Sequence, residues 1–251
     1  MGGPGTGGGG IVLTRRIVAL VQARMGSTRF PGKMMADLAG YPVLRWVLER
    51  ARRARRLDQV VLVTTTAARD DELVTLADGM GIEIHRGSEA DVLGRMAEAA
   101  RQAGAGTVVR VCADNPLIDG AVVDAAIDDF LAGGADYVFN HTPKGGSRCA
   151  DGLGAEVLAA PLLDEIDRIA DTDHQREHVT AYIWDNQERF TVRAVDCPPD
   201  WDPRSDAIRL DVDRPEDLDH LRQVCAGLDF GAPAATILAR WRAVAREAAP
   251  V

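Results

Sequence analysis

Short apolar runs alternate with longer amphipathic stretches along the chain from Arg16 onward. An apolar run of four to eight residues is typical of a buried strand, and apolar positions with a period near 3.6 are typical of a helix that covers a sheet. We expect strands over 17–23, 60–64, 82–85, 108–112 and 137–140, with helices between them. This alternation predicts an α/β fold with a mostly parallel central sheet flanked by helices.

The first helical pattern shows the division between apolar and charged faces. Val43, Val47, Ala51 and Ala54 form one apolar stripe, and arginines cover much of the rest. The basic run RARRARR over 50–56 is therefore predicted to be mostly a solvated helix face and helix end, where cations suit the helix dipole.

The alternation breaks after Asn140. The polar, glycine-rich stretch TPKGGSRCADGLG precedes helical patterns at 160–169 and 174–186, and strands follow near 190–195 and 207–212 before a closing helix that begins at Pro215. We interpret the segment from about 140 to 186 as an insertion that contacts the substrate or a second subunit. The rest of 16–251 is expected to form one domain with it.

The first fifteen residues carry little that could order a backbone. Residues 1–10 read MGGPGTGGGG, which predicts a flexible tail over 1–15. A literal GxGxxG occurs there, but the dinucleotide fingerprint needs a strand before it and a helix after it. The tail therefore gives no sign of a dinucleotide site.

Composition and charge narrow the class of partner. The 251 residues carry a formal net charge of −9, which argues against a general affinity for nucleic acid. No apolar run is long enough to span a bilayer, so no membrane partner is expected. The four cysteines form no CxxC pair and fit neither a disulfide framework nor a zinc knuckle, so we expect them to be reduced and the protein to be cytoplasmic.

Three cations and two glycines follow the first predicted strand, in the stretch QARMGSTRFPGK over 22–33. Loops at the carboxyl ends of parallel strands bind ligands in open α/β sheets. The turn at Gly26 and Ser27 lets backbone N–H groups approach an anion, and Arg24, Arg29 and Lys33 supply charge for a polyphosphate. The spacing is not that of a Walker A loop, which needs Ser or Thr after the lysine.

Carboxylates follow two other predicted strands. Asp114 comes just after the run VRVC, and Asp211 and Asp213 share one side of an alternating segment before Pro215. Carboxylate oxygens at a phosphate site are typical Mg²⁺ ligands, so we expect Asp114, Asp211 and Asp213 to hold that ion. Helix capping is a sufficient explanation for Asp119, and also serves for Asp91.

These motifs resemble the cytidylyltransferases that activate acidic sugars, most closely the spore coat polysaccharide biosynthesis branch. The stretch VQARMGSTRFPGKMMADLAGYPVLRWVLER is similar to that family's signature nearly throughout. RGSEADVLGRM, RVCADNPLID, DGLGAEVL, REHVTAYI and LDVDRPEDL follow in the expected order. The likeness covers about 17–224.

The resemblance implies a Rossmann-like nucleotidyltransferase fold that binds CTP and Mg²⁺, transfers CMP to an acceptor and releases pyrophosphate. It implies catalytic roles for Arg24, Lys33, Asp114 and Asp213, with metal ligation by Asp114, Asp211 and Asp213. Nucleotide contacts are expected at Ala23, Gly26, Ser27, Thr64 and Arg95. The choice of cytosine over uracil does not follow from these residues.

The acceptor is expected to be small and acidic. The residues placed to meet it are Arg148, Glu156 and His178, with Lys144 as a second cation able to pair with a carboxylate or phosphonate. Alanine at 150 and at 181 departs from the family's more usual proline in both motifs, which leaves the acceptor open. The alternatives are a small phosphonate acceptor, or a glycosyltransferase that uses a nucleotide-sugar.

Two further readings concern the segment 174–186. HQREH over 174–178 spells the HxxEH pattern of some zinc peptidases, although a short pattern alone often arises by chance. The segment also carries more apolar surface than one core is expected to cover, at Val179, Tyr182, Ile183 and Trp184. This surface favours a homodimer.

Overall fold

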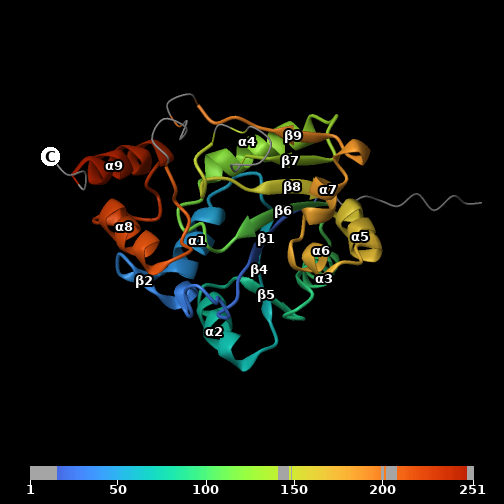
Figure 1. The fold of residues 1–251 in the computed structure, drawn as a ribbon, viewed down its shortest axis with the longest axis horizontal. Helices are drawn as coiled ribbons and strands as arrows, with labels where there is room; N and C mark the ends of the chain where they lie inside the picture. The colour runs from blue at the N-terminus through green and yellow to red at the C-terminus, as the bar shows by residue number, and fades with distance from the viewer. Residues whose placement is uncertain (1–15, 141–146, 148, 199–200, 202–207, 248–251) are drawn as a thin grey trace, which may run out of the picture.

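A seven-stranded sheet forms the centre of the molecule (Figure 1). The computed structural model describes residues 16–140, 147, 149–198, 201 and 208–247. The strands are β1 (Ile17–Gln22), β4 (Gln59–Thr65), β5 (Glu83–Gly87), β6 (Thr107–Cys112), β7 (Tyr137–Phe139), β8 (Glu156–Ala159) and β9 (Val192–Ala194). They lie in the order β5-β4-β1-β6-β8-β7-β9, and β8 is antiparallel to both of its neighbours while every other pairing is parallel.

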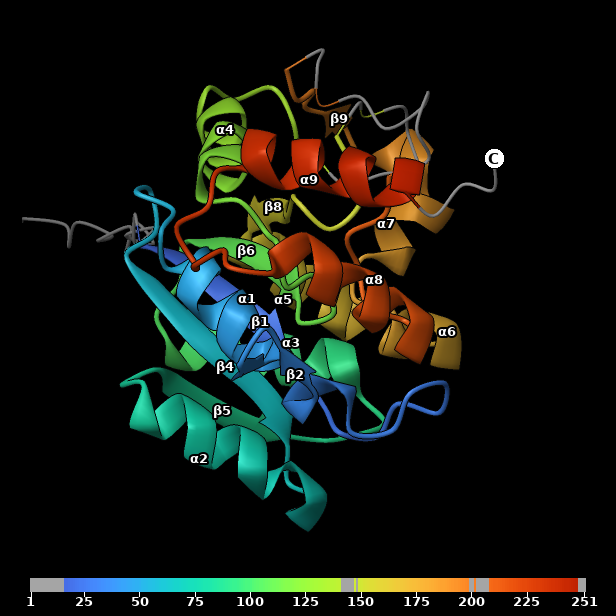
Figure 2. The ribbon, with the colours of Figure 1, turned by 90° about the vertical axis from the view of Figure 1, so that its left-hand side faces the viewer.

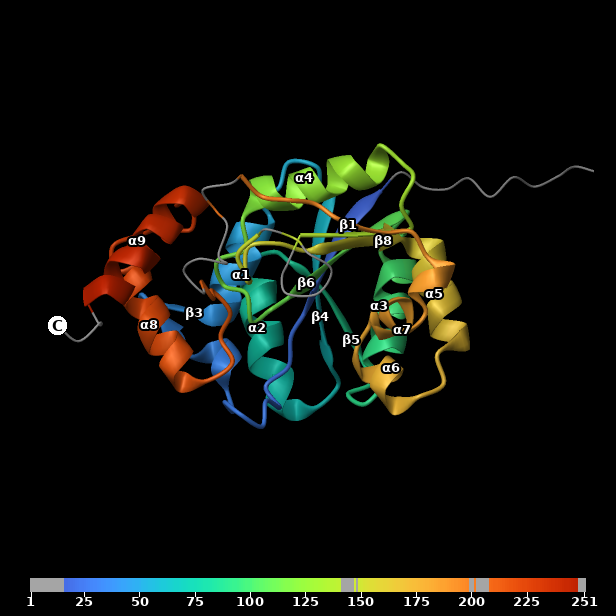
Figure 3. The ribbon, with the colours of Figure 1, turned by 45° about the horizontal axis from the view of Figure 1, so that its top comes forward.

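Helices cover both faces of this sheet (Figure 3). On one face lie α1 (Val43–Ala51), α2 (Asp71–Gly79), α4 (Gly120–Leu131), α8 (Pro215–Cys225) and α9 (Ala234–Glu247). On the other lie α3 (Val92–Gln102), α5 (Ala160–Ile169), α6 (Asp173–Glu177) and α7 (Ala181–Asp185). Figure 2 looks onto the first face, with α8 and α9 outermost. Beside them, β2 (Asp37–Leu38) pairs with β3 (Tyr41–Pro42).

Alternate residues of β1 enter opposite cores. Ala19 and Val21 pack on the α1 side, and Val18 and Leu20 pack on the α3 side, all fully buried. A parallel strand covered on both faces reads as a continuous apolar run, as IVALV does. The sequence-based expectation of a mostly parallel sheet flanked by helices is therefore confirmed.

Strand β8 was not expected from the sequence. It lies inside the segment interpreted as an insertion, yet it pairs with β6 and β7 in the central sheet. Its four residues, EVLA, are too few for alternation to be distinguished from the start of the helix that follows. The segment from 140 to 186 therefore supplies part of the sheet itself.

Two further elements differ from the sequence-based expectation. The helix expected over 174–186 is two short helices, α6 and α7, because the backbone at His178 is extended. The strand expected over 207–212 is reduced, among residues 208–212, to an isolated bridge between Arg209 and Asp151. Ala207 lies outside the described residues, as does the glycine-rich tail 1–15.

The apolar residues of α7 and the turn before it are covered by the chain's own core. Val179 and Ile183 are buried, and Tyr182 and Trp184 pack against the same core on the α3 side. Trp184 also meets Phe139 edge to face. These residues are therefore covered within the chain itself, and the homodimer predicted from them stays a prediction.

The basic run is mostly solvated, as expected, because Arg52, Arg53, Arg55 and Arg56 are exposed, and Arg50 is the exception. Its side chain is 3% exposed, and it donates hydrogen bonds to the carbonyl oxygens of Ile118, Phe230 and Ala232. Asp119 faces it at 3.5 Å. Burial lowers the pKa of Arg50, and Asp119 opposes that shift. Arg50 therefore ties α1 to the chain between α8 and α9.

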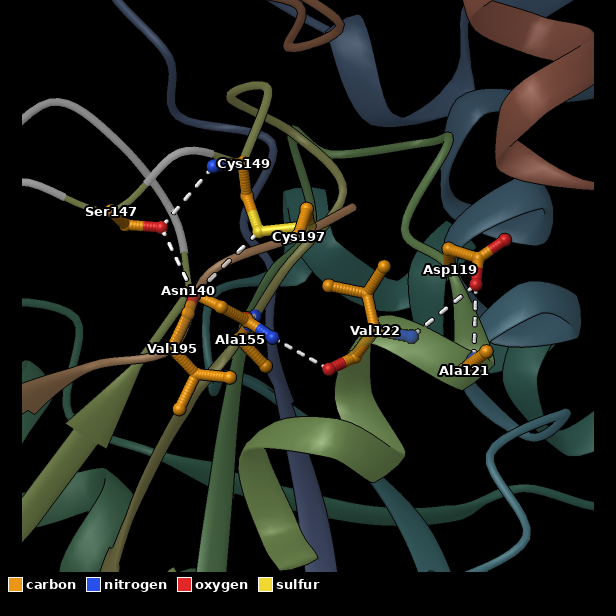
Figure 4. Close-up of a disulfide and its surroundings, with 9 residues drawn as sticks. All are labelled: Asp119, Ala121, Val122, Asn140, Ser147, Cys149, Ala155, Val195 and Cys197. Atoms are coloured by element: carbon orange, nitrogen blue, oxygen red, sulfur yellow. Dashed lines mark hydrogen bonds between the residues drawn. A yellow bond between two sulfur atoms is a disulfide. The ribbon is translucent and has the colours of Figure 1, made fainter. Parts of the chain in front are cut away.

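Cys149 and Cys197 form a disulfide, so the expectation that all four cysteines are reduced is wrong (Figure 4). The bond joins the chain ahead of β8 to the chain after β9, and both cysteines are buried. Near it, the Asn140 side chain donates to Val122 O and accepts from Ala155 N, which fixes the start of β8. Because the disulfide exists, the cysteines no longer support a cytoplasmic location.

Among the described residues, no helix is long and apolar enough to cross a membrane.

Candidate active site

The loop after β1 is held by a buried carboxylate that the sequence analysis missed. Asp70 is fully buried and accepts a 2.8 Å hydrogen bond from the backbone N–H of Met25. It also accepts from the hydroxyl groups of Thr64 and Thr65. Thr64 is thereby occupied beneath the loop and does not line the cavities described below. The contact that Thr64 makes is with Asp70, and its contact with a nucleotide stays a prediction.

The turn itself is built from small residues. The Ser27 hydroxyl accepts from the backbone N–H of Phe30, and Gly32 takes the left-handed conformation with φ of 75°. A Cβ at Gly26 would lie 3.1 to 3.3 Å from the ion-paired side chains of Arg69 and Glu89, so a larger residue there would press on them. The small residues therefore favour a tight turn at this strand end, with a backbone that a ligand can approach closely.

Lys33 turns inward from the end of this loop. Its ammonium donates a 2.7 Å hydrogen bond to Val212 O and lies 3.5 Å from Asp114 and 3.7 Å from Asp213. The side chain is 11% exposed. A cation buried to this extent needs anionic and carbonyl partners, and two carboxylates supply them. Lys33 thus joins all three chain segments that the sequence analysis assigned to the site.

The chain from 208 to 213 crosses the ends of two other segments. Val212 N donates to Asp114 O at 2.8 Å, and Leu210 N donates to Asp151 O at 3.1 Å. The Asp217 carboxylate accepts from the backbone N–H groups of Asp213 and Arg214 and so closes the start of α8, which Pro215 opens as expected. The position of Asp213 is therefore fixed by its backbone.

Two adjoining cavities lie at this edge of the sheet. The loop cavity, of about 410 Å³, contains most of the first loop together with Val92, Glu177 and His178. The carboxylate cavity, of about 360 Å³, contains Asp151, Glu156, Arg209 and Asp211. Five residues line both cavities: Arg29, Arg110, Cys112, Asp114 and Asp213. The two cavities are therefore neighbouring parts of one site.

Most of the predicted residues come together there. The loop cavity is lined by Ala23, Arg24, Gly26, Ser27, Lys33 and His178. The carboxylate cavity is lined by Glu156 and Asp211, and both cavities are lined by Asp114 and Asp213. Arg95 lines neither, and its side chain is buried with a hydrogen bond to Ser88 O. Arg148 and Lys144 lie outside the described residues.

The carboxylate cavity has an excess of negative charge. Its lining holds five carboxylates and three arginines. Asp213 pairs with Arg29 at 2.6 Å, and Asp211 pairs with Arg209 at 2.5 Å. Burial raises the pKa of Asp151 to about 6, and the nearby carboxylates of Asp211 and Asp114 contribute to the increase. The site therefore favours a bound cation.

The donor chemistry fits a hard divalent ion. Asp114 and Asp213 place carboxylate oxygens 3.5 and 3.7 Å from the Lys33 ammonium, and Asp211 lines the same cavity. Oxygen ligands of this kind suit Mg²⁺ or Mn²⁺. As they stand, no three carboxylate, histidine or cysteine side chains in the described part of the chain are close enough to enclose an ion. A bound ion would therefore complete its shell with oxygens of a ligand.

The HxxEH pattern does not form a two-histidine site on one helix. Helix α6 ends at Glu177, and His178 follows it in an extended conformation. The two histidine rings lie 4.8 Å apart, centroid to centroid. Glu177 faces Arg24 at 3.4 Å, so it belongs to the loop cavity. The segment lines the site that the other motifs define.

Arg110 and Asp151 were missed by the sequence analysis. Arg110 stands inside the apolar run VVRVC of β6, where its spacing of two and four residues from Cys112 and Asp114 was the available signal. Asp151 lies in a glycine-rich turn, and its neighbour Gly152 has a φ of 94°. Nothing in the local pattern distinguishes Asp151 from an ordinary turn residue.

The fold, together with a site where cations of the first loop face carboxylates, defines a nucleotidyltransferase. A family model for cytidylyltransferases matches residues 18–232. The chain is 31% identical to the spore coat polysaccharide biosynthesis protein SpsF of Bacillus subtilis, over 82% of this chain and 85% of that protein. It is 42% identical to the 3-deoxy-manno-octulosonate cytidylyltransferase of Geobacter sulfurreducens, over 44% of each chain.

A solved cytidylyltransferase from Leptospira borgpetersenii has a similar structure. It superposes with a TM-score of 0.82 at 28% identity and covers 93% of this chain and 95% of its own. With the family model matching most of the sequence, the chain belongs to the cytidylyltransferase family.

Proposed function

We propose that this protein is a Mg²⁺-dependent cytidylyltransferase that transfers CMP from CTP to an acidic sugar and releases pyrophosphate. The observation that carries the proposal is the single site in which Arg24, Arg29 and Lys33 face Asp114 and Asp213. Cations and oxygen ligands together neutralise a triphosphate, and transfer of this kind depends mainly on positioning and charge stabilisation.

The loop cavity would hold the nucleotide. Backbone N–H groups at Gly26 and Ser27 would approach the β- and γ-phosphates, while Arg24 and Lys33 compensate charge on the leaving pyrophosphate. Arg24 and Lys33 are now engaged by Glu177, Asp114 and Asp213. Binding a triphosphate therefore exchanges carboxylate partners for phosphate oxygens.

Mg²⁺ would be held by Asp114 and Asp213, with Asp211 beside them. When bound, the ion polarises phosphoryl oxygens and neutralises developing charge. The contribution of the chain is to fix both carboxylates: Asp114 O accepts from Val212 N, and Asp213 N donates to Asp217. Lys33 keeps the two carboxylates compensated before ligands enter.

Base recognition is proposed for Arg95 together with Ala23 and Thr64. Arg95 is 2% exposed, and in the described part of the chain its Nε and Nη2 atoms have no hydrogen-bond partner. A buried guanidinium with unpaired donors needs an acceptor from a ligand or water. The carbonyl group of a pyrimidine base has the required chemistry.

The acceptor is proposed to enter the carboxylate cavity beside Glu156, and His178, the other predicted acceptor contact, would reach it from the loop cavity. One relative named above concerns a spore coat polysaccharide, and another acts on 3-deoxy-manno-octulosonate. Both names support a sugar or sugar acid as the acceptor. A cytoplasmic location, a homodimer, and the absence of nucleic-acid and membrane partners remain part of this proposal.

The test is pyrophosphate release with CTP, UTP, ATP and GTP against acidic sugars, neutral sugars and small phosphonates, with and without Mg²⁺. We expect release with CTP and an acidic sugar, and at least a 100-fold loss in Asp213→Asn. Asp219→Asn is the matched control, because this exposed carboxylate of α8 pairs with Arg222 away from both cavities. Turnover of a nucleotide-sugar without pyrophosphate release would replace the proposal with a glycosyltransferase.

A further inference from the structure

Arg110 occupies the boundary between the two cavities. It lies in the middle of β6, directly opposite Glu156 of β8, and it lines both the loop cavity and the carboxylate cavity. Its side chain is 13% exposed. Replacing a buried ion pair by packed apolar residues is often neutral or stabilising, so fold stability alone does not explain an arginine here.

Glu156 holds only one nitrogen of the guanidinium. Arg110 Nη1 donates to Glu156 Oε1 at 2.5 Å, whereas Nη2 reaches Gln22 Oε1 only at 3.4 Å. The Nε atom has no hydrogen-bond partner among the described residues. Burial lowers the pKa of Arg110, but the nearby acidic groups, Cys112 and then Glu156, outweigh burial and raise it, so the group is charged. Glu156 fixes one nitrogen of this planar fork, so Nη2, which is held only by the long Gln22 contact, is the donor left for a ligand in the adjoining cavities.

The other two arginines of the carboxylate cavity already pair with proposed metal ligands. Arg29 is paired with Asp213, and Arg209 makes two hydrogen bonds to Asp211. An acidic acceptor that enters a cavity with five carboxylates needs a cation that can offset this repulsion. Of the three arginines that line this cavity, Arg110 is the most buried, at 13% exposed against 64% for Arg29 and 60% for Arg209, and it does not pair with a proposed metal ligand.

We propose that Arg110 binds the acid group of the acceptor at the boundary of the two cavities, and that Glu156 is a positioning residue that orients its guanidinium. This inference rests on the proposed cytidylyl transfer. Binding the acid group there would leave an acceptor hydroxyl directed toward the loop cavity, because Arg110 lines both cavities. The α-phosphate of the nucleotide is the other anion that could meet Arg110, and the experiment separates the two.

The experiment compares the wild type with Arg110→Lys and with the double variant Arg110→Gln/Glu156→Gln, which leaves no buried charge unpaired. Binding of CTP and of 3-deoxy-manno-octulosonate is measured separately by calorimetry, the second in the presence of a non-hydrolysable CTP analogue. The other acidic sugars and phosphonates of the panel are titrated in the same way. Arg101→Gln is the matched control, since Arg101 pairs with Asp164 on the outer surface of α3 and α5.

We expect wild type to bind at least one acid, with about a 100-fold loss in the double variant and an unchanged dissociation constant for CTP. Arg110→Lys should retain part of the affinity for the acid. Glu156→Gln alone should lower that affinity less than the double variant does. In turnover, the KM for the acid should rise more than kcat falls. Melting curves confirm that each variant is folded.

Three results would overturn the inference. Equal losses of CTP and acid affinity would assign Arg110 to the nucleotide. Equal binding of an acid and its neutral alcohol analogue would remove the need for a cation. Binding of CTP by the wild type with no binding of any acid in the panel would also overturn it. Cytidylyl transfer to a neutral acceptor would still support the proposed transfer reaction, whereas absence of CTP binding would overturn that reaction itself.

Discussion

The ammonium of Lys33 donates a 2.7 Å hydrogen bond to the carbonyl oxygen of Val212, 179 residues further along the chain. This contact closes the site, because it brings the loop after β1 against the segment that carries Asp213. Lys33 is also within 3.7 Å of Asp114 and Asp213. One buried cation therefore connects the proposed phosphate-binding and metal-binding residues before any ligand is bound.

Replacing Lys33 with methionine should reduce turnover by about 100-fold or more, because a charge aimed at the leaving pyrophosphate is lost. The same change leaves Asp114 and Asp213 without the ammonium that compensates their charge. We therefore expect Mg²⁺ to raise the melting temperature of Lys33→Met more than that of wild type. Steady-state kinetics and thermal melts with and without Mg²⁺ measure both effects. Activity within threefold of wild type would contradict the assigned role.

Asp151→Asn should stabilise the ligand-free protein at neutral pH. The raised pKa of about 6, against an ordinary value of 3.8, corresponds to at most about 3 kcal/mol. The folded state holds the proton more tightly, so wild type carries no penalty below pH 4, gains one as pH rises to 6, and keeps it above 6. We expect Asp151→Asn to melt a few degrees higher at pH 7.

The pH dependence provides the check. Melting curves of wild type and Asp151→Asn should converge as pH falls from 6 toward 4.5. Asp151 is protonated in a growing fraction of wild-type molecules over this range, whereas the asparagine is uncharged throughout. A constant difference across this range would show that packing, and not ionisation, separates the two proteins. Asp219→Asn should show no such trend, since Asp219 is exposed.

The sequence predicts the site residues that lie just after strands. It misses the charged residues that are buried inside strands and helices. Lys33, Asp114 and Asp213 were identified because each lies just beyond or beside an apolar run. Arg50 and Arg110 were missed, since a cation inside an apolar pattern carries no local sign of the partners that bury it. Strand β8 depends on β6 and β7, which lie elsewhere in the sequence, so its four residues could not be assigned locally.

The disulfide illustrates the same limit and leads to a prediction. Cys149 and Cys197 are separated by 48 residues and belong to no recognisable motif. A cross-link over a loop of this length contributes about 4 kcal/mol in the chain-entropy model. We expect reduction, or Cys149→Ser, to lower the free energy of unfolding by about 2–4 kcal/mol. Urea denaturation with and without dithiothreitol measures this, and identical midpoints would contradict it.

Cys112 should be an unreactive thiol although it lines both cavities. Burial raises its pKa to about 12, and the nearby carboxylates of Asp114 and Glu156 add to the increase. Because the thiolate is the nucleophile, alkylation by iodoacetamide at pH 8 should be about 1,000-fold slower than for a free cysteine. The rate should keep rising with pH as long as the fold survives. Bound CTP should slow it further, because the nucleotide would fill the loop cavity.

Peptide mass spectrometry of the Cys112 peptide measures this rate without interference from the other free cysteine, Cys225, whose pKa burial also raises to about 12. Unfolded protein in urea is the internal control and should react at the ordinary rate of a thiol. If Cys112 is labelled within minutes at pH 7.5 in the folded enzyme, the thiol is solvated or charged. The floor of the site beside Arg110 would then be open to water, which would also weaken the electrostatic attraction proposed there for an acidic acceptor.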